Sequence, residues 1–370
     1  MIGRGEDVAD LARTLGNGIN TIVTGPRRTG KTTVCAAAVD RLRKEGTYTV
    51  SVDLFRSSDA AGLAQAMIEA TIRNRSPVAR ALHAVRRAGS AARKSVEAAS
   101  VWKLKDEFGD GIEVVLQPGF AERDPQKALE YAFELPQRIA EADDKRVVLF
   151  FDEFQEITAR GAPYGDVDLV TKRLRSILQR SPSVTSLFAG SVEHLMRGLF
   201  GSGRRAFFQF GGFYELTEID ARTWMAGLRD RFAEDGCELE ETALSRLVEL
   251  GELHPRATML IAQHVHDVSV VQATRSITGA TIEIGYRYAL AADRPNHELT
   301  ISRVRDWRNG PNALAVARRI ARAQPVYGNL NPGTARRAVG ALRDAGLIER
   351  SVPRGWRITD PFLRRYLEQE

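Results

Sequence analysis

The sequence has little that could serve a membrane span, a disulfide framework or a cysteine-based metal site. Only two cysteines occur in 370 residues, Cys35 and Cys237, so disulfide scaffolds and cysteine zinc sites are disfavoured and both thiols are expected to be buried apolar residues. The longest aliphatic–aromatic run, residues 147–151, is far too short to cross a bilayer. The first residues contain no apolar signal-peptide region, so the cytoplasm is the expected compartment.

Repeats, low-complexity tracts and histidine metal motifs are also missing. His254, His264 and His266 show no metal-ligand spacing, so we expect them to be structural. What remains is an ordinary globular composition, with 43% hydrophobic and 27% charged residues. The length predicts about two to three domains.

One motif carries most of the chemical information. Residues 25–32 read Gly-Pro-Arg-Arg-Thr-Gly-Lys-Thr, a complete G-x-x-x-x-G-K-[ST] phosphate-binding loop between a predicted strand and a predicted helix. Its glycines let backbone N–H groups face the phosphates, its lysine supplies a cation, and its last hydroxyl can ligate Mg²⁺. The residues expected to bind ATP are Gly25, Pro26, Arg27, Arg28, Thr29, Gly30, Lys31, Thr32 and Thr33.

A second motif completes the expected ATP site. The apolar run 147–151 reads as a buried strand and ends in Asp152 and Glu153. A carboxylate at that strand end would lie beside Thr32, so Thr32 and Asp152 are the predicted Mg²⁺ ligands. Glu153 is then the candidate to polarise the attacking water.

The order of elements predicts an α/β fold in which a parallel sheet is covered by helices on both faces. Strands are expected at 21–24, 48–52, 147–151, 186–189 and 207–210, separated by helices. Residues 1–216 would form this core, with a long basic helical insertion at about 60–146. A helical lid is predicted at 217–270, a helical connector at 271–300 and a separate module at 301–370.

The final 70 residues read as a winged helix-turn-helix. Two helices are expected at 312–324 and 334–345, followed by short strands at 347–350 and 355–359. The segment between the helices is too short for a full middle helix, and such modules also dock proteins. If the module binds double-stranded DNA, its contacts would be Arg336, Arg337, Arg343 and Arg354.

The positive charge is concentrated in two places. Residues 301–370 hold fourteen arginines against six acidic residues, and residues 71–105 hold nine basic residues against one acidic residue. Concentrated positive charge favours a polyanionic partner such as nucleic acid. A solvated arginine-rich face is the alternative reading.

These motifs together resemble one family. Asp152-Glu153-Phe154-Gln155 after an apolar strand, the sequence 188–191 (Phe-Ala-Gly-Ser) on the next strand, and Gly3-Arg4-Gly5-Glu6 ahead of the phosphate loop look like the archaeal-type ATPase family. That family belongs to the AAA+/STAND P-loop ATPases and is related to the origin-recognition ATPases. The similarity extends over nearly the whole chain, since 360–363 (Asp-Pro-Phe-Leu) is similar to the family's ending.

The resemblance implies further roles. Ser191 falls at the sensor-1 position, where Asn is more usual. Arg204 and Arg205 fall where these ATPases place an arginine finger that acts on the nucleotide of a neighbouring subunit, so a homo-oligomer is one of the partners that the resemblance allows. Arg256 matches a sensor-2 arginine, although Leu253-His254 replaces the family's preceding glycine.

Three functions follow as hypotheses. The first is a slow, Mg²⁺-dependent ATPase that acts as a nucleotide-dependent switch and binds DNA through the winged helix. The second is a STAND-type signalling regulator with slow hydrolysis, whose winged helix and basic insertion bind protein partners. The third is a non-catalytic adaptor whose basic segment 71–105 docks a partner protein or a membrane surface.

Overall fold

The computed structural model describes residues 1–25, 29–74, 120–158, 163–201, 203, 205–351 and 355–370. Several predicted features fall on the other residues and so lie outside this description. They are Pro26, Arg27, Arg28, Arg204, Arg354 and most of the basic segment 71–105.

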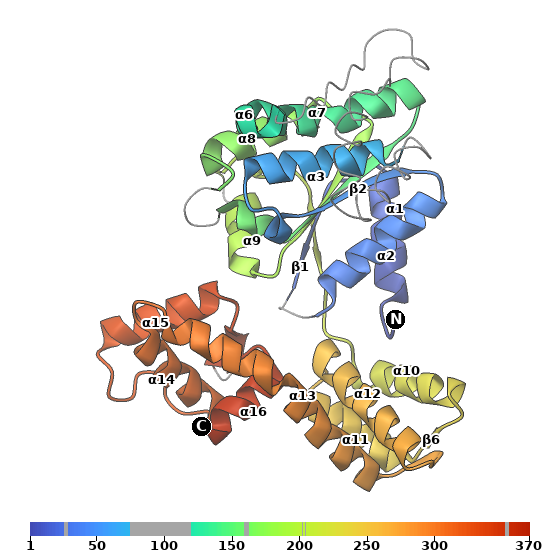
Figure 1. The fold of residues 1–370 in the computed structure, drawn as a ribbon, viewed down its shortest axis with the longest axis vertical. Helices are drawn as coiled ribbons and strands as arrows, with labels where there is room; N and C mark the ends of the chain where they lie inside the picture. The colour runs from blue at the N-terminus through green and yellow to red at the C-terminus, as the bar shows by residue number, and fades with distance from the viewer. Residues whose placement is uncertain (26–28, 75–119, 159–162, 202, 204, 352–354) are drawn as a thin grey trace, which may run out of the picture.

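A five-stranded parallel sheet forms the core of the N-terminal part (Figure 1). Its order is β2 (Tyr48–Asp53), β3 (Val147–Asp152), β4 (Val184–Ala189), β1 (Thr21–Thr24) and β5 (Gly212–Glu215). The predicted α/β class is therefore confirmed. Since β4 lies between β1 and β3, the strands that end at the phosphate loop and at Asp152 are separated by one strand.

Helices cover both faces of the sheet, as strand alternation requires. Val23, Val148 and Phe150 pack on one face against α1 (Gly5–Gly16) and α2 (Lys31–Lys44). Ile22 and Phe151 point to the other face. That face is covered by α3 (Ala60–Ile72), α7 (Pro125–Asp143), α8 (Val167–Gln179) and α9 (Glu193–Phe200), and the short α6 (Phe120–Arg123) lies beside α7. The two ends of the predicted insertion 60–146 are thus helices of the core itself.

The fifth strand was predicted at the wrong place. Residues 207–210 are not a strand, because Phe207 is buried in a cluster of rings with Phe154, Phe188 and Phe200. The fifth strand is instead Gly212–Glu215, which pairs with β1 on the side away from β4, at the edge of the sheet, and is mostly exposed. Aromatic residues raise strand propensity, but here their packing against the core decided the local structure.

A helical unit follows the sheet. It contains α10 (Ala221–Glu234), α11 (Glu241–Gly251) and α12 (Pro255–Val271), with a two-stranded parallel ribbon of β6 (Glu238–Leu239) and β7 (Ser276–Ile277). Asp220 caps α10 by accepting a hydrogen bond from the Thr223 N–H, as its residue type favours. One buried cluster of apolar side chains holds these helices together.

The C-terminal module contains α14 (Gly310–Ala321), α15 (Pro332–Asp344), the antiparallel hairpin of β8 (Ile348–Ser351) and β9 (Gly355–Ile358), and α16 (Pro361–Gln369). No helix forms between α14 and α15, which agrees with the short spacing in the sequence. Gly346 ends the second helix region with a φ of 67°, a left-handed conformation that favours glycine.

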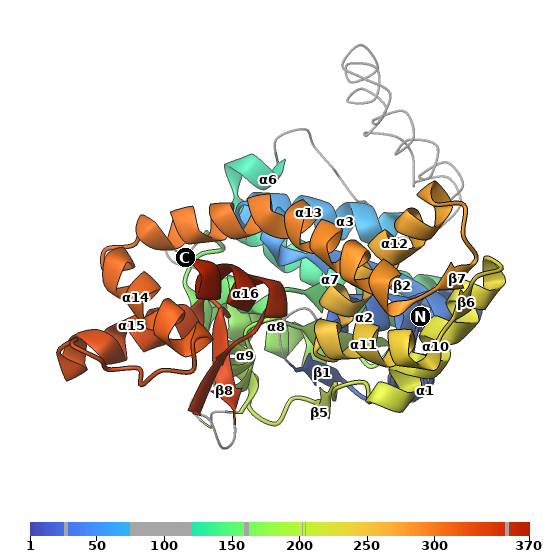
Figure 2. The same cartoon turned by 90° about the horizontal axis from the view of Figure 1, so that it is seen from below.

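A long helix, α13 (Gly279–Arg305), joins the helical unit to the C-terminal module (Figure 2). Ile282 and Ala289 in its first half belong to the core of the helical unit, whereas Ile301 and Val304 near its end belong to the core of the C-terminal module. The same 27-residue helix therefore serves two hydrophobic cores. Among the described residues, no helix is long and apolar enough to cross a membrane.

The C-terminal module also contacts the other two units through ion pairs. His194 on α9 lies 3.0 Å from Asp344 at the end of α15. Arg357 on β9 pairs with Glu218, just before α10, at 3.0 Å, and Arg364 on α16 pairs with Glu252 after α11. The module is thereby held against both the sheet domain and the helical unit.

Candidate nucleotide-binding site

The phosphate loop begins where β1 ends. Gly25 has a φ of 143°, and a Cβ at this position would lie 2.9 Å from the Leu216 carbonyl oxygen, so only glycine fits here. Gly30, also left-handed, caps α2, which starts at Lys31. The start of α2 therefore presents N–H groups without intrahelical partners and the positive end of the helix dipole, an arrangement that suits an anion.

Lys31 and Thr32 supply the side chains of this loop. Lys31 is buried, with 6% of the residue exposed, and its ammonium donates to the Gly25 carbonyl oxygen at 2.8 Å. Thr29 is buried, whereas Thr32 and Thr33 are exposed at the first turn of α2. A buried lysine in the first turn of a helix suits a polyphosphate. The ammonium and the positive end of the helix dipole both attract the negative phosphate groups.

Asp152 meets Thr32 across the sheet edge. The Thr32 Oγ1 donates to Asp152 Oδ1 at 3.2 Å, which brings the two predicted Mg²⁺ ligands together. Burial raises the pKa of Asp152 to about 6, and the neighbouring carboxylates of Glu153 and Asp53 act in the same direction, while the Thr32 hydrogen bond opposes them. A hydroxyl and a carboxylate in contact, at a position where negative charge is disfavoured, form an oxygen donor set that fits Mg²⁺.

Glu153 follows Asp152 with an unusual backbone conformation. Its φ is 50°, which is uncommon for a residue with a side chain. The carboxylate Oε2 accepts a hydrogen bond from Ser191 Oγ at 2.7 Å, and the Ser191 N–H lies 3.3 Å away. The predicted water-polarising residue and the predicted sensor are therefore in direct contact.

Arg205 forms an ion pair within its own chain. Its Nη1 lies 2.6 Å from Asp168 Oδ1 near the start of α8, and both side chains are largely exposed. Exposed pairs of this kind contribute about 0–1 kcal/mol, so the guanidinium could be recruited elsewhere at little cost.

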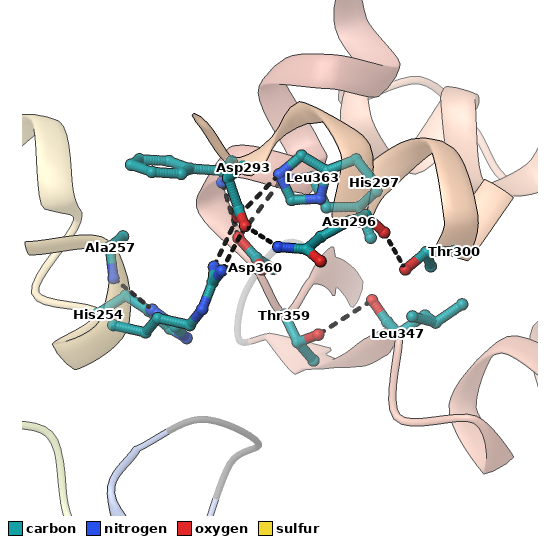
Figure 3. Close-up of polar contacts among 12 residues, drawn as sticks. His254, Ala257, Asp293, Asn296, His297, Thr300, Leu347, Thr359, Asp360 and Leu363 are labelled. Atoms are coloured by element: carbon teal, nitrogen blue, oxygen red, sulfur yellow. Dashed lines mark hydrogen bonds and ion pairs between the residues drawn. The ribbon is translucent and has the colours of Figure 1, made fainter. Parts of the chain in front are cut away.

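Arg256 lies in a buried ionic network that sequence reasoning did not anticipate. Figure 3 shows its other members Asp293, His297 and Asp360 close together. From the first turn of α12, the Arg256 guanidinium donates to both oxygens of Asp293 on α13, and Nη1 lies 3.8 Å from Asp360 at the start of α16. His297 Nε2 is 3.1 Å from Asp293, and Asn296 donates to the same carboxylate at 2.8 Å. Asp293 is 1% exposed, so this network is a paired buried charge.

The contacts of Asp293 favour the ionised form of its carboxylate. Burial alone would raise its pKa, but the hydrogen bonds from Arg256 and Asn296 and the nearby His297 outweigh burial and hold the pKa far below its usual range. Ligand atoms of Asp293, His297 and Asp360 lie within 4.8 Å of one another, as in a metal site. The Arg256 guanidinium occupies the cationic position among them, so we assign no metal there.

The predicted DNA contacts in the described part of the chain lie on α15. Arg336, Arg337 and Arg343 are all on the surface of this helix, and the last of these pairs with the neighbouring Asp344. Asp344 in turn contacts His194 of the sheet domain. The end of this helix is therefore in contact with the core.

Two features of the site could not be expected from the sequence motifs. Gln155 appeared only as part of a family pattern, yet its amide donates to Glu153 at 2.5 Å. The partners of Arg256 are far away in sequence, and the only visible signal was the i, i+4 spacing of Asp293 and His297 on a predicted helical segment.

No family model matches the sequence, and a search of curated proteins finds no significant match. Solved structures do match over almost the whole chain. The Walker-type ATPase of Pyrococcus abyssi is 16% identical with a TM-score of 0.70, covering 99% of this chain and 96% of its own. The ORC2 protein of Aeropyrum pernix in ADPNP–ADP complexes is 16% identical with a TM-score of 0.60, covering 100% and 93%, and its ADP form is 14% identical with a TM-score of 0.54, covering 100% and 94%. The fold of this chain is thus that of the archaeal Walker-type and origin-recognition ATPases.

Proposed function

We propose that this protein binds Mg²⁺–ATP, hydrolyses it slowly and acts as a nucleotide-dependent switch in the cytoplasm. The contact between Thr32 and Asp152, 3.2 Å apart at the ends of two different elements, is the observation that carries the proposal. It joins a phosphate loop with a buried Lys31 to a carboxylate that favours a cation. Neither half alone would distinguish an ATPase from a protein that only holds a phosphate.

Each side chain then has a separate task. The N–H groups at the start of α2 and the Lys31 ammonium would bind the phosphates, and Thr32 and Asp152 would hold Mg²⁺. When bound, Mg²⁺ supplies positive charge to the phosphate oxygens. Glu153 would accept a hydrogen bond from the attacking water and orient it, with Ser191 holding its carboxylate. A second copy of the chain would contribute Arg204 or Arg205 at the developing charge, which makes isolated subunits slow.

The test is steady-state ATP hydrolysis with Mg²⁺, with a chelator, and with a Glu153→Gln protein. We expect chelation to abolish turnover and Glu153→Gln to lower kcat by about 100-fold, because the amide cannot accept a proton from water. Nucleotide affinity should be retained, since Glu153 does not hold the phosphates. Glu298→Gln, an exposed glutamate on α13, is the matched control. Equal rates for wild type and Glu153→Gln would rule out the assignment.

We further propose that α15 binds double-stranded DNA as the recognition helix of a winged helix-turn-helix. Two helices followed by a hairpin, with Arg336 and Arg337 exposed on the second helix, support this proposal. Replacing both arginines by alanine should weaken binding to a labelled duplex and reduce the slope of log K against log salt by about 1 for each phosphate that is no longer bound. The matched control replaces Arg229 and Arg231, both exposed on α10. Equal DNA affinity of the two double variants would exclude this role of α15.

A signalling regulator whose C-terminal module contacts proteins instead is the second candidate. The proximity of the C-terminal module to the phosphate loop supports this second candidate. Thr29 of the loop and Arg357 and Thr359 of the module line one small cavity of about 50 Å³. In a regulator of this kind, nucleotide bound at the loop would change the contacts of the C-terminal module directly. Hydrolysis stimulated by duplex DNA at low salt would support the DNA-coupled switch, whereas slow hydrolysis indifferent to DNA would support the regulator.

A further inference from the structure

We propose that Gln155 is a positioning residue for Glu153, an inference that rests on the hydrolytic function proposed above. Gln155 lies in the short 3₁₀ turn η2 (Phe154–Thr158) that follows β3. It would not touch ATP or water itself. Its role would be to fix one oxygen of the Glu153 carboxylate so that the other faces the water.

The Gln155 side chain is almost completely enclosed, with 3% of its surface exposed. Its amide nitrogen donates to Glu153 Oε2 at 2.5 Å and lies 3.5 Å from Glu156 Oε1. Its carbonyl oxygen, in contrast, is buried and has no hydrogen-bond partner among the described residues. The opposite orientation of the amide would place this oxygen against the Glu153 carboxylate, so the contact with Glu153 decides the orientation.

This arrangement does not favour stability. A buried acceptor without a partner costs about 1–3 kcal/mol, which an apolar side chain of the same size would avoid. Gly190 at the end of β4 leaves the necessary space, because a Cβ there would collide with the Gln155 carbonyl oxygen and with the side chain of Met196. Gly190 after β4 thus leaves room for Gln155 after β3, although the unpaired oxygen of this glutamine destabilises the fold. This cost points to a role of Gln155 at the adjacent Glu153 carboxylate.

The contacts specify that role. All the side-chain hydrogen bonds described for the Glu153 carboxylate are made to Oε2, from Gln155 Nε2, Ser191 Oγ and Ser191 N. Donors from two different strand ends hold one oxygen from two sides, so rotation of the carboxylate about its last bond is restricted. Oε1 is then the oxygen that would accept a hydrogen bond from water in a defined direction.

The test is a Gln155→Met protein, which keeps the volume and removes both the donor and the unpaired acceptor. We expect kcat to fall about 10-fold, because misorientation of a base by a fraction of an ångström has effects of this order. The dissociation constant of a fluorescent ATP analogue should be unchanged, and the thermal midpoint Tm should be equal to or higher than that of wild type.

Gln137 on α7 provides a matched control. It is also buried and also donates to a glutamate, Glu141, at 2.7 Å, but its oxygen is paired with the Ser183 N–H. Gln137→Met should therefore lower Tm and leave kcat unchanged, the reverse of the Gln155 variant.

The outcomes separate this inference from the function on which it rests. A kcat unchanged by Gln155→Met, or a kcat that falls together with Tm, would overturn the positioning role while the effect of Glu153→Gln still supports hydrolysis. If the kcat of Glu153→Gln equals that of wild type, both the hydrolytic assignment of Glu153 and the role of Gln155 are wrong. A lower kcat at unchanged nucleotide affinity and undiminished Tm supports the proposal.

Discussion

Replacing Lys31 by alanine is expected to lower ATP hydrolysis by at least about 1,000-fold, because a fixed positive charge at the phosphates stabilises the transition state in a site with little water. The ammonium is buried and held by the Gly25 carbonyl at 2.8 Å, so its position is set before nucleotide arrives. Nucleotide affinity should fall as well. Radiolabelled phosphate release and titration with a fluorescent ATP analogue would measure the two effects.

The control for this variant is Lys44→Ala at the other end of the same helix. Lys44 is largely exposed and pairs only weakly with Asp40, so its replacement removes the same charge without touching the loop. We expect hydrolysis and affinity of Lys44→Ala to match wild type. A Lys31→Ala protein that binds and hydrolyses ATP normally would exclude residues 25–32 as the phosphate site.

Arg256→Met is expected to lower the free energy of unfolding by about 3–5 kcal/mol, since the variant leaves the buried Asp293 carboxylate without its guanidinium partner. Asp293 is 1% exposed and loses both guanidinium hydrogen bonds in this variant. The change can be measured by urea denaturation at neutral pH. Arg229→Met removes an exposed pair with Glu241 and should cost less than about 1 kcal/mol.

The pH dependence gives an independent check on Asp293. Its pKa is lower in the folded protein than in the unfolded chain, so its stabilising contribution is complete above the unfolded value of about 4. The contribution is lost as the pH falls from there toward the folded pKa. In Arg256→Met this loss of stability on acidification should be smaller, and an acid loss as steep as that of wild type would contradict the pairing. If Arg256 instead binds nucleotide, the variant would lose ATP affinity at undiminished stability.

Local patterns predicted the centre of the site because its parts are continuous in sequence or lie at strand ends. The phosphate loop is one segment, and Asp152 follows a strand that had to be buried. The wrong fifth strand shows the limit of this reasoning. Phe207 and Phe210 suit a strand, but contacts with Phe154 and Phe188 from other elements decided their conformation. Nothing near them in the sequence reports such contacts.

The same limit explains the position of Arg256. The family resemblance predicts Arg256 near the nucleotide. Its observed partners Asp293 and Asp360 lie 37 and 104 residues further along the chain. Charges of opposite sign are frequent in this sequence, and only the folded arrangement selects which of them become buried together. Gln155 and Glu153, in contrast, are close in sequence. The proposed role of Gln155 nevertheless depends on its unpaired side-chain oxygen, which only the three-dimensional structure reveals.

The single helix α13 has a mechanical consequence. Its 27 residues, at 1.5 Å each, extend over about 40 Å, and each end is embedded in a different core. A tilt of about 5° at the end held by the helical unit would displace the other end by about 3.5 Å. A small change of tilt at the helical unit is therefore amplified along α13 before it reaches the C-terminal module. A rotation that barely moves the helical unit becomes, at the C-terminal module, a displacement as large as an atom.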